Sequence, residues 1–138
     1  MTSADFELDK RLAADTSPVI SLPLCDVLLM KDARYPWLVL VPRRARLIEL
    51  TDLDEAEQTV LWREVNQAGA ALRSVASCDK LNLGVLGNIV RQLHVHIVLR
   101  HDGDEAWPGP VWGNGRSVPY AADDLATFIQ RLKKTWAN

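Results

Sequence analysis

The segment from Gln92 to Arg100 alternates between two sets of side chains. One set is apolar throughout, and the other is mostly polar and includes two of the chain's three histidines. A period of two residues predicts a β-strand, in which successive side chains point to opposite faces of a sheet. The apolar face would pack on a core, and the histidine face would meet a site, a partner or water. The apolar set is Leu93, Val95, Ile97 and Leu99, and the other set is Gln92, His94, His96, Val98 and Arg100.

The rest of the chain predicts an α+β fold around this strand. Two apolar runs joined by a turn at Asp32–Pro36 favour an antiparallel hairpin. Apolar residues recur at helical spacing after Thr51, which would cap that helix with Asp54 three residues on. This order predicts a single domain over residues 1–138, with an antiparallel sheet of about five strands and two main helices. The expected strands are Val19–Leu22, Asp26–Lys31, Trp37–Val41, part of Lys80–Val90 and Gln92–Arg100, and the expected helices are Asp5–Ala14, Thr51–Ser77 and Ala121–Trp136.

Composition narrows the class of protein. The formal net charge is −2, so we expect no general attraction to nucleic acid or to an anionic membrane. No apolar run is long enough to cross a bilayer, and the first ten residues lack the pattern of a secretory signal. Cys25 and Cys78 stand outside any Cys-x-x-Cys spacing, which predicts free thiols and a cytoplasmic protein.

Three interpretations of His94 and His96 compete. They could be two histidines on a solvated strand face with no chemical role. They could share a zinc ion, but a structural zinc site needs about four ligands, and no Cys-x-x-Cys or His-x-x-x-His pair supplies the others. They could also serve nucleophilic catalysis, because a neutral imidazole can attack phosphorus and form a covalent intermediate. The spacing alone leaves all three open.

The sequence around the two histidines resembles the signature of the histidine-triad (HIT) family. Gly87–Arg100 is similar to the family's run of alternating histidines and apolar residues, which often ends in arginine. Asn82 precedes this run, Asp32 follows an apolar segment, and Leu38–Pro42 is similar to the family's strand of apolar residues before proline. The resemblance covers roughly Cys25–Arg100, and it implies a HIT-like fold.

The resemblance also implies roles for individual residues. His94 matches the family's nucleophile, which attacks the α-phosphorus of a nucleotide and holds a nucleotidyl group. His96 matches the histidine that contacts the phosphate or the bridging oxygen near the leaving group. Gln92 stands where the first histidine usually supports the nucleophile, and an amide can still donate and accept hydrogen bonds.

Four further residues are candidates for substrate binding. The resemblance implies that Asn88 and Asn82 contact the phosphates and that Asp32 binds ribose hydroxyls. Arg100 lies on the predicted histidine face, where it could steer a phosphate chain or simply end a solvated strand. Two tryptophans lie in the loop Trp107–Gly113, where they could stack on a base, seal a dimer or pack locally on the sheet.

By the same resemblance we expect a purine nucleotide substrate and a homodimer with a continuous sheet. The substrates would be dinucleoside polyphosphates or nucleoside monophosphate derivatives, hydrolysed or transferred without a required cofactor. No metal-ligand set is visible, although a divalent cation could accompany the substrate. The rival hypothesis is a nucleotide-binding module without turnover. Gln92 motivates it, as does Trp37, which lies where many members carry a further histidine.

Overall fold

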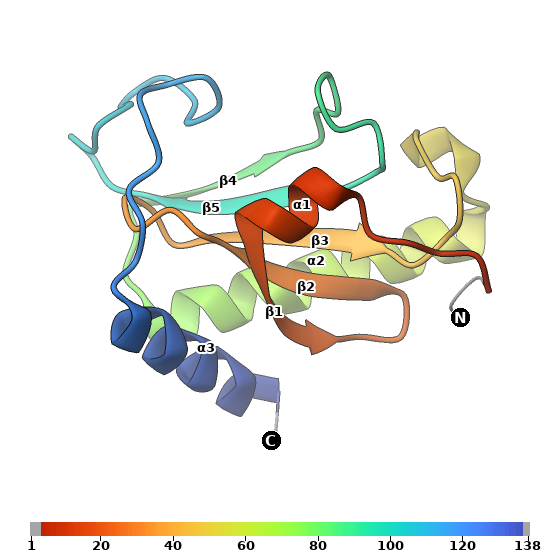
Figure 1. The fold of residues 1–138 in the computed structure, drawn as a ribbon, viewed down its shortest axis with the longest axis horizontal. Coiled ribbons are helices and arrows are strands. Elements are labelled where there is room, and N and C mark those ends of the chain that lie inside the picture. The colour runs from red at the N-terminus through yellow and green to blue at the C-terminus, as the bar shows by residue number, and fades with distance from the viewer. Residues whose placement is uncertain (1–3, 137–138) are drawn as a thin grey trace.

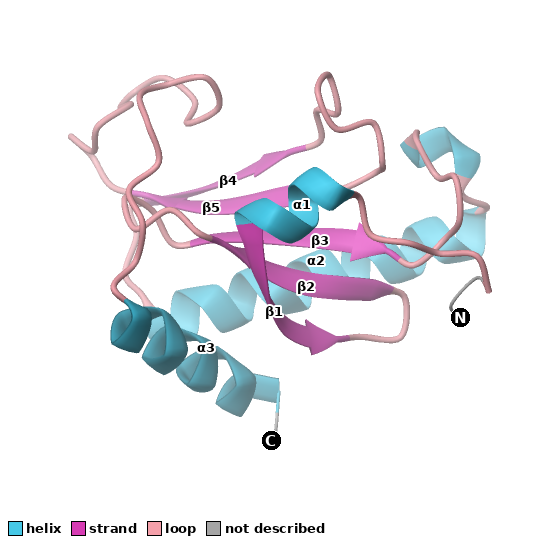
Figure 2. Ribbon diagram, in the orientation of Figure 1, coloured by secondary structure: helices cyan, strands magenta, loops and turns pink. Residues whose placement is uncertain are grey.

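Five strands form one sheet in the computed structural model, which describes residues 4–136. The strand order is β1-β2-β3-β5-β4, and every neighbouring pair is antiparallel. Figure 1 shows the sheet with its helices, and Figure 2 separates helices, strands and loops by colour. The elements are α1 (Lys10–Asp15), β1 (Thr16–Ser21), β2 (Cys25–Met30), β3 (Trp37–Pro42), a 3-10 turn (Leu50–Asp52), α2 (Glu55–Val75), β4 (Lys80–Gly84), β5 (Val95–Arg100) and α3 (Ala122–Trp136). The predicted α+β class and antiparallel sheet are confirmed.

The two central strands are buried along their whole length. Every residue of β3 and of β5 is buried, because both faces of the sheet are covered at its centre. The long helix α2 and the C-terminal α3 lie on one face, and α1 lies on the other (Figure 1). A strand covered on both faces loses the alternation of apolar and polar residues, which accounts for the uninterrupted apolar run of Trp37–Pro42.

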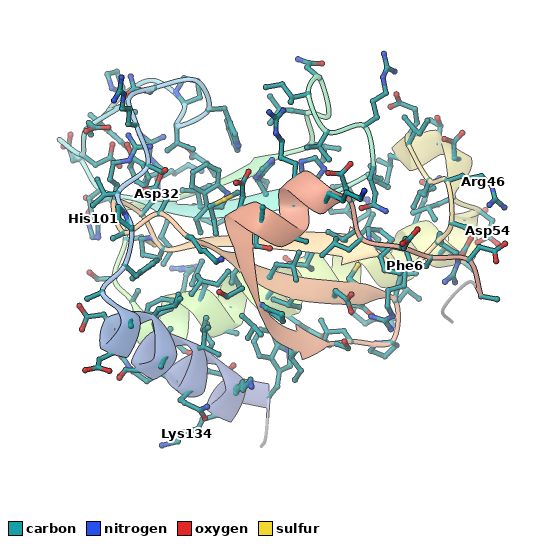
Figure 3. The ribbon with its side chains drawn as sticks, in the orientation of Figure 1. Phe6, Asp32, Arg46, Asp54, His101 and Lys134 are labelled. Atoms are coloured by element: carbon teal, nitrogen blue, oxygen red, sulfur yellow. The ribbon has the colours of Figure 1, made fainter. Side chains whose placement is uncertain are left out.

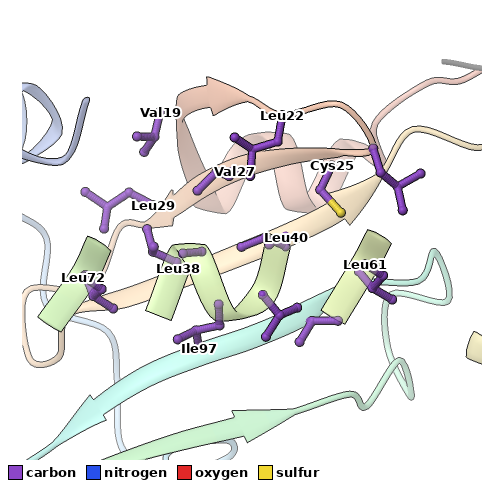
Figure 4. Packing of buried hydrophobic residues seen from close by; sticks show 14 of the residues in the cluster. Val19, Leu22, Cys25, Val27, Leu29, Leu38, Leu40, Leu61, Leu72 and Ile97 are labelled. Carbon is purple, nitrogen blue, oxygen red and sulfur yellow. The ribbon is translucent and has the colours of Figure 1, made fainter. Parts of the chain in front are cut away.

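The larger core lies between the sheet and α2 (Figure 4). Leu93 and the apolar face of β5 belong to it, together with Leu61 and Leu72 of α2 and Leu132 of α3. The predicted apolar face of the histidine segment is therefore confirmed. A second cluster lies on the opposite face, and it consists of Leu12, Leu28, Tyr35, Trp37, Val39, Val41, Val98 and Val111.

The histidine strand is shorter than predicted. β5 begins at Val95 rather than at Gln92, because the N–H of Leu93 donates to the carbonyl of Leu47, 2.9 Å away, instead of joining the sheet. His94 is consequently the last residue of the loop before β5.

The starts of two helices also differ from the prediction. The helix expected from Thr51 begins at Glu55, and the carboxylate of Asp54 caps it by accepting from the N–H of Glu57 at 2.8 Å. Thr51 lies in the preceding 3-10 turn. The first helix begins at Lys10 rather than at Asp5, with Asp9 as its N-cap. Within residues 4–136, no helix combines the length and apolar character that crossing a membrane requires.

Candidate active site

A cavity of about 630 Å³ opens on the face of the sheet that α1 partly covers. Its walls come from α1, the end of β2 and the turn after it, β3, the loop between β4 and β5, the start of β5, and the loop between β5 and α3. A volume of this size is typical of pockets for small molecules. Its wall includes His94, His96, Trp37, Trp112, Asn88 and Asp32.

His94 is held by its own loop. Its Nδ1 lies 2.7 Å from the backbone oxygen of Gln92, and a carbonyl oxygen can only accept a hydrogen bond. Nδ1 therefore carries the proton in the neutral ring, and Nε2 keeps its lone pair. His94 is 5% exposed and lines the cavity, so the buried imidazole has the form that a nucleophile or a hydrogen-bond acceptor requires.

His96 is held in the opposite tautomer. Its Nδ1 lies 3.0 Å from the indole Nε1 of Trp37, and an indole N–H can only donate. Nδ1 of His96 therefore accepts, and its Nε2 carries the proton. Burial, and then the proximity of His94, lowers the pKa of His96 to about 3, so this ring is neutral at physiological pH.

The two imidazoles lie next to each other with complementary chemistry. Their ring centroids are 4.8 Å apart and the planes meet at 73°. His94 has a free lone pair, whereas His96 has a free N–H. A phosphoryl group between them would meet an acceptor or nucleophile on one ring and a hydrogen-bond donor on the other.

Trp112, in the loop between β5 and α3, packs against this pair of histidines. Its ring lies 5.3 Å from that of His96 and 6.4 Å from that of Trp37, both in edge-to-face arrangements. Gly84 makes room for the indole, since a Cβ at Gly84 would lie 2.6 Å from Cη2 of Trp112. Of the two tryptophans that the sequence singled out in this loop, Trp112 lines the cavity. Trp107 instead packs against Arg100, whose guanidinium carbon lies 5.6 Å from its ring centroid.

Gly84→Ala is expected to displace Trp112 and to destabilise the protein by about 1–3 kcal/mol, the usual cost of overpacking. Denaturant unfolding measures the change. The control is to introduce Gly84→Ala into a Trp112→Leu protein. The smaller side chain removes the clash, so the added methyl group should cost little stability relative to Trp112→Leu alone. An equal penalty for Gly84→Ala in both backgrounds would show that contact with Trp112 is not the cause.

Asp32 lies at another part of the cavity wall, under the loop between β5 and α3 (Figure 3). It is 2% exposed, and its carboxylate accepts from the side chain of Arg34 at 2.8 Å and from the N–H of Val118 at 3.2 Å. Burial alone would raise the pKa of Asp32, but the hydrogen bonds from Arg34 and Val118 outweigh it and lower the pKa. Arg34 also contacts Glu105 and the carbonyl of Asn114. Asp32 therefore anchors the loop as well as lining the cavity.

Gln92 does not direct its side chain to the histidines. Its Oε1 accepts from the N–H of Asp9 and its Nε2 donates to the carbonyl of Glu7, both at 2.8 Å. The amide thus fastens the segment that leads into α1. Only the backbone oxygen of Gln92 contacts His94, so the support for the nucleophile comes from the main chain.

Asn82 and Arg100 lie together outside the cavity wall. Arg100 is 1% exposed. It donates to Oδ1 of Asn82 at 2.9 Å and to both carboxylate oxygens of Asp104 at 2.8 Å. Hydrogen bonds from Arg100 are the main cause that lowers the pKa of Asp104. The geometry gives a structural place to Arg100, at the end of β5, and to Asn82, on the neighbouring β4. Asn88, for which the resemblance implied a contact with phosphate, lines the cavity.

Several wall residues were not predicted from the sequence. Arg11 and Lys31 supply positive charge to the cavity wall, and Leu12 of α1 lines it as well. Trp37 was noted only as a departure from the family pattern. For Trp112, the Pro-Gly loop in which it lies was a signal in the sequence. For the residues of α1 there was no such signal, because their spacing does not relate them to the histidines. In residues 4–136, no three His, Cys, Asp or Glu side chains come together in a way that could hold a metal ion.

Comparison with known proteins places the chain in a family. The model of the HIT domain matches residues 11–103, and the chain therefore belongs to the HIT family, whose members generally bind or hydrolyse nucleotides. Comparison with curated proteins finds no match.

Solved structures of bacterial histidine-triad proteins resemble the chain over nearly its whole length. One from Sinorhizobium meliloti 1021 is 45% identical with a TM-score of 0.92, covering 95% of this chain and 97% of that one. One from Bradyrhizobium japonicum is 47% identical with a TM-score of 0.91, covering 94% and 97%. One from Marinobacter aquaeolei VT8 is 42% identical with a TM-score of 0.91, covering 94% and 95%.

Proposed function

We propose that this chain is a nucleotide-phosphate hydrolase or nucleotidyltransferase that works through a nucleotidyl intermediate on His94. The observation that carries the proposal is the pair of oppositely held imidazoles on the cavity wall. His94 offers a lone pair on Nε2, and His96 offers an N–H beside it. Dinucleoside polyphosphates and nucleoside monophosphate derivatives are the proposed substrates.

The chemistry would proceed in two displacements at phosphorus. Nε2 of His94 forms a bond to the α-phosphorus, and the bond from phosphorus to the leaving group breaks with its electron pair. In the second step the oxygen of water, or of an acceptor, attacks the same phosphorus. The N–P bond then breaks, its electron pair returns to Nε2, and the attacking oxygen loses its proton to solvent. Throughout, the N–H of His96 can donate to a phosphate oxygen that gains charge.

The cavity wall offers groups suited to the rest of a nucleotide. Asn88 has an amide that can donate to phosphate oxygens. Arg11, Lys31 and Arg34 carry positive charge that attracts a polyphosphate even though the chain as a whole is slightly acidic. Asp32 keeps its proposed role towards ribose hydroxyls, in addition to its hydrogen bonds with Arg34.

A substrate panel tests the proposal. Purified protein is incubated with dinucleoside polyphosphates, nucleoside phosphoramidates and nucleotide sugars, and the products are separated by chromatography. We expect turnover of at least one class, and we expect the His94→Ala variant to lose it. Equal rates for the wild type and for His94→Ala on every active substrate would contradict the catalytic claim.

A nucleotide-binding module is the second candidate, and the position of Gln92 favours it. Gln92 stands where the family's first histidine usually supports the nucleophile, but its amide is bound to the N-terminal segment instead of to His94. If this candidate is correct, calorimetry detects binding of a nucleotide that the protein does not turn over. Binding without turnover across the whole panel would favour the module over the enzyme.

We also propose that two copies pair through the edge strand β4. Leu83, Val85, Leu86 and Ile89 are exposed apolar residues on β4 and the loop after it, with between 44% and 77% of each exposed. A shallow cavity of about 200 Å³ lies between β4 and α2, lined by Gly69, Leu81 and Leu83 among others. An exposed edge strand with apolar neighbours favours pairing with another strand, which would extend the sheet across the dimer.

Leu83→Arg is expected to convert the proposed dimer into a monomer, because a buried unpaired charge would lie at the strand pairing. Light scattering coupled to size-exclusion chromatography measures the mass. Val118→Arg is the matched control, since Val118 is similarly exposed at 48%. Its carbonyl accepts from the N–H of Ala33 in the turn between β2 and β3, away from the edge that β4 forms. A wild-type mass equal to one chain would contradict the dimer.

The cysteines support the proposed cytoplasmic location. Both are free thiols, as predicted, and Cys25 is buried. Burial is the main cause that raises the pKa of Cys25, and the neighbouring Glu64 raises it further. Free thiols are typical of a reducing compartment.

A further inference from the structure

We infer that Trp37 is a positioning residue that fixes His96 as a hydrogen-bond donor, so that the site favours leaving groups that depart without being protonated. This inference rests on the proposed function and concerns the leaving-group side of the same reaction. It follows from three contacts of His96, with Trp37, Trp112 and His94. The consequence is a preference for phosphate anhydrides over phosphoramidates.

The first step is the tautomer. The indole N–H of Trp37 donates to Nδ1 of His96 at 3.0 Å. Protonation of Nδ1 would place two N–H groups face to face, which would break this hydrogen bond and leave the indole N–H of a buried residue unpaired. Trp37 is 7% exposed and His96 is 6% exposed, so water cannot readily take over either group. The Nε2–H tautomer is therefore the stable one.

The second step is the immobility of the ring. The ring of His96 packs edge-to-face with the rings of Trp112 and His94, whose centroids lie 5.3 and 4.8 Å away. On the strand itself, His96 pairs with Val39 of β3 on one side and with Gly84 of β4 on the other. A ring flip, which would put Cδ2 where Nδ1 lies and break the hydrogen bond with Trp37, would have to displace these neighbours. The N–H of His96 thus stays on Nε2.

The third step is what such a ring can transfer. A neutral imidazole that gives up its Nε2 proton becomes an imidazolate anion, which is costly in a buried site. An imidazolium is also disfavoured, because burial and the adjacent His94 lower the pKa of His96 to about 3. Among the described residues, His94 is the only titratable side chain with a ring contact to His96. His96 can therefore stabilise a departing oxygen by a hydrogen bond, but it is a poor source of a proton.

This difference separates two kinds of substrate. When a phosphate anhydride reacts with His94, the P–O bond breaks and its electron pair stays on the oxygen of a phosphate, which is stable as an anion. When a phosphoramidate reacts, the P–N bond breaks and the electron pair stays on nitrogen, which must receive a proton to leave as an amine. General acid catalysis contributes about 100-fold to 10,000-fold, so its lack should cost the phosphoramidate a comparable factor.

The test joins a spectroscopic measurement to a kinetic one. Long-range ¹H–¹⁵N spectra of protein labelled at histidine report the tautomer of His96 without any substrate. Rates are measured for diadenosine triphosphate and for adenosine 5′-phosphoramidate. The variants are Trp37→Phe and Trp37→Leu, neither of which has an N–H to donate, the second in case the first folds poorly. Trp136→Phe is the matched control, because it removes an indole from α3 on the opposite face of the sheet.

We expect wild type and Trp136→Phe to show only the Nε2–H form of His96 and to favour the anhydride by about 100-fold or more in kcat/KM. Both Trp37 variants should show mixed tautomers and a preference reduced by about tenfold or more. A wild-type His96 protonated on Nδ1, an unchanged tautomer in both Trp37 variants, or equal wild-type rates on the two substrates would overturn the inference. Failure of wild type to turn over either substrate would instead overturn the proposed function together with the leaving-group preference, and the spectra would still decide whether Trp37 fixes His96.

Discussion

His94→Asn is expected to reduce kcat by about 1000-fold or more while leaving the fold intact. Removing a nucleophile eliminates the covalent route, and losses of this size or larger are usual when such a residue is replaced. Asparagine is the informative choice because its amide N–H can still donate to the carbonyl of Gln92, which lies 2.7 Å from Nδ1 of His94. It has no counterpart of Nε2. The measurements are kcat and the single-turnover rate on the best substrate of the panel, with unfolding followed in parallel.

His101→Asn is the matched control for this variant. His101 is exposed and lies just after β5, where its ring is near Ser77 and Asp79 rather than in the cavity. We expect wild-type rates from it. A His94→Asn protein that is folded and as active as His101→Asn would show that the imidazole of His94 does not react.

Arg100→Met is expected to lower the free energy of unfolding by about 3 kcal/mol or more. Removing one partner of a buried ion pair leaves the other charge uncompensated, which commonly costs about 3–5 kcal/mol. Here the change removes two hydrogen bonds to Asp104 and one to Asn82. It also removes the guanidinium that lies over the rings of Tyr35 and Trp107. Urea unfolding of both proteins measures the difference.

Arg46→Met is the control for the loss of an arginine. The side chain of Arg46 is 81% exposed and its nearest ionic partner, Asp5, lies 3.9 Å away. Exposed pairs of this kind contribute roughly 0–1 kcal/mol. If Arg100→Met kept wild-type stability and instead raised KM, Arg100 would bind substrate, as its position on the histidine segment first suggested, and the structural assignment would fail.

Much of the fold could be predicted because its signals are local. The alternation around Val95 and Ile97 predicted the buried face of β5, and helical spacing predicted α2. Both patterns arise from one element packing on one core, so that the period of the side chains is visible in the sequence. The predicted start of β5 was wrong because the N–H of Leu93 donates to the carbonyl of Leu47. This contact is between segments far apart in the sequence, so no local pattern predicts it.

The candidate site was predicted only where it follows the strand. His94 and His96 lie on one wall because they flank one position of an extended chain. The orientation of Gln92 depends on Glu7 and on Asp9, 83 residues earlier, and that pairing is set by tertiary structure alone. Trp112 comes from a loop without periodicity, so its place beside His96 could not be derived.

The role of Trp37 also could not be predicted from the sequence. From the sequence it was a departure from a family pattern, and it weakened the case for catalysis. In the fold its indole occupies the position from which a donor can fix the tautomer of His96. The identity of the residue was informative only after its partner was known.

The most direct test of the account is to trap the intermediate on His94. The reaction with the best substrate of the panel is quenched in alkali within the first turnover, because a phosphorus bond to an imidazole nitrogen is labile in acid, and the digested protein is examined by mass spectrometry. We predict a nucleotidyl group on the peptide that contains His94, assigned to that ring by fragmentation and absent from His94→Asn. Turnover by wild type with no adduct, or with the nucleotidyl group on His96 or His101, would contradict the central claim.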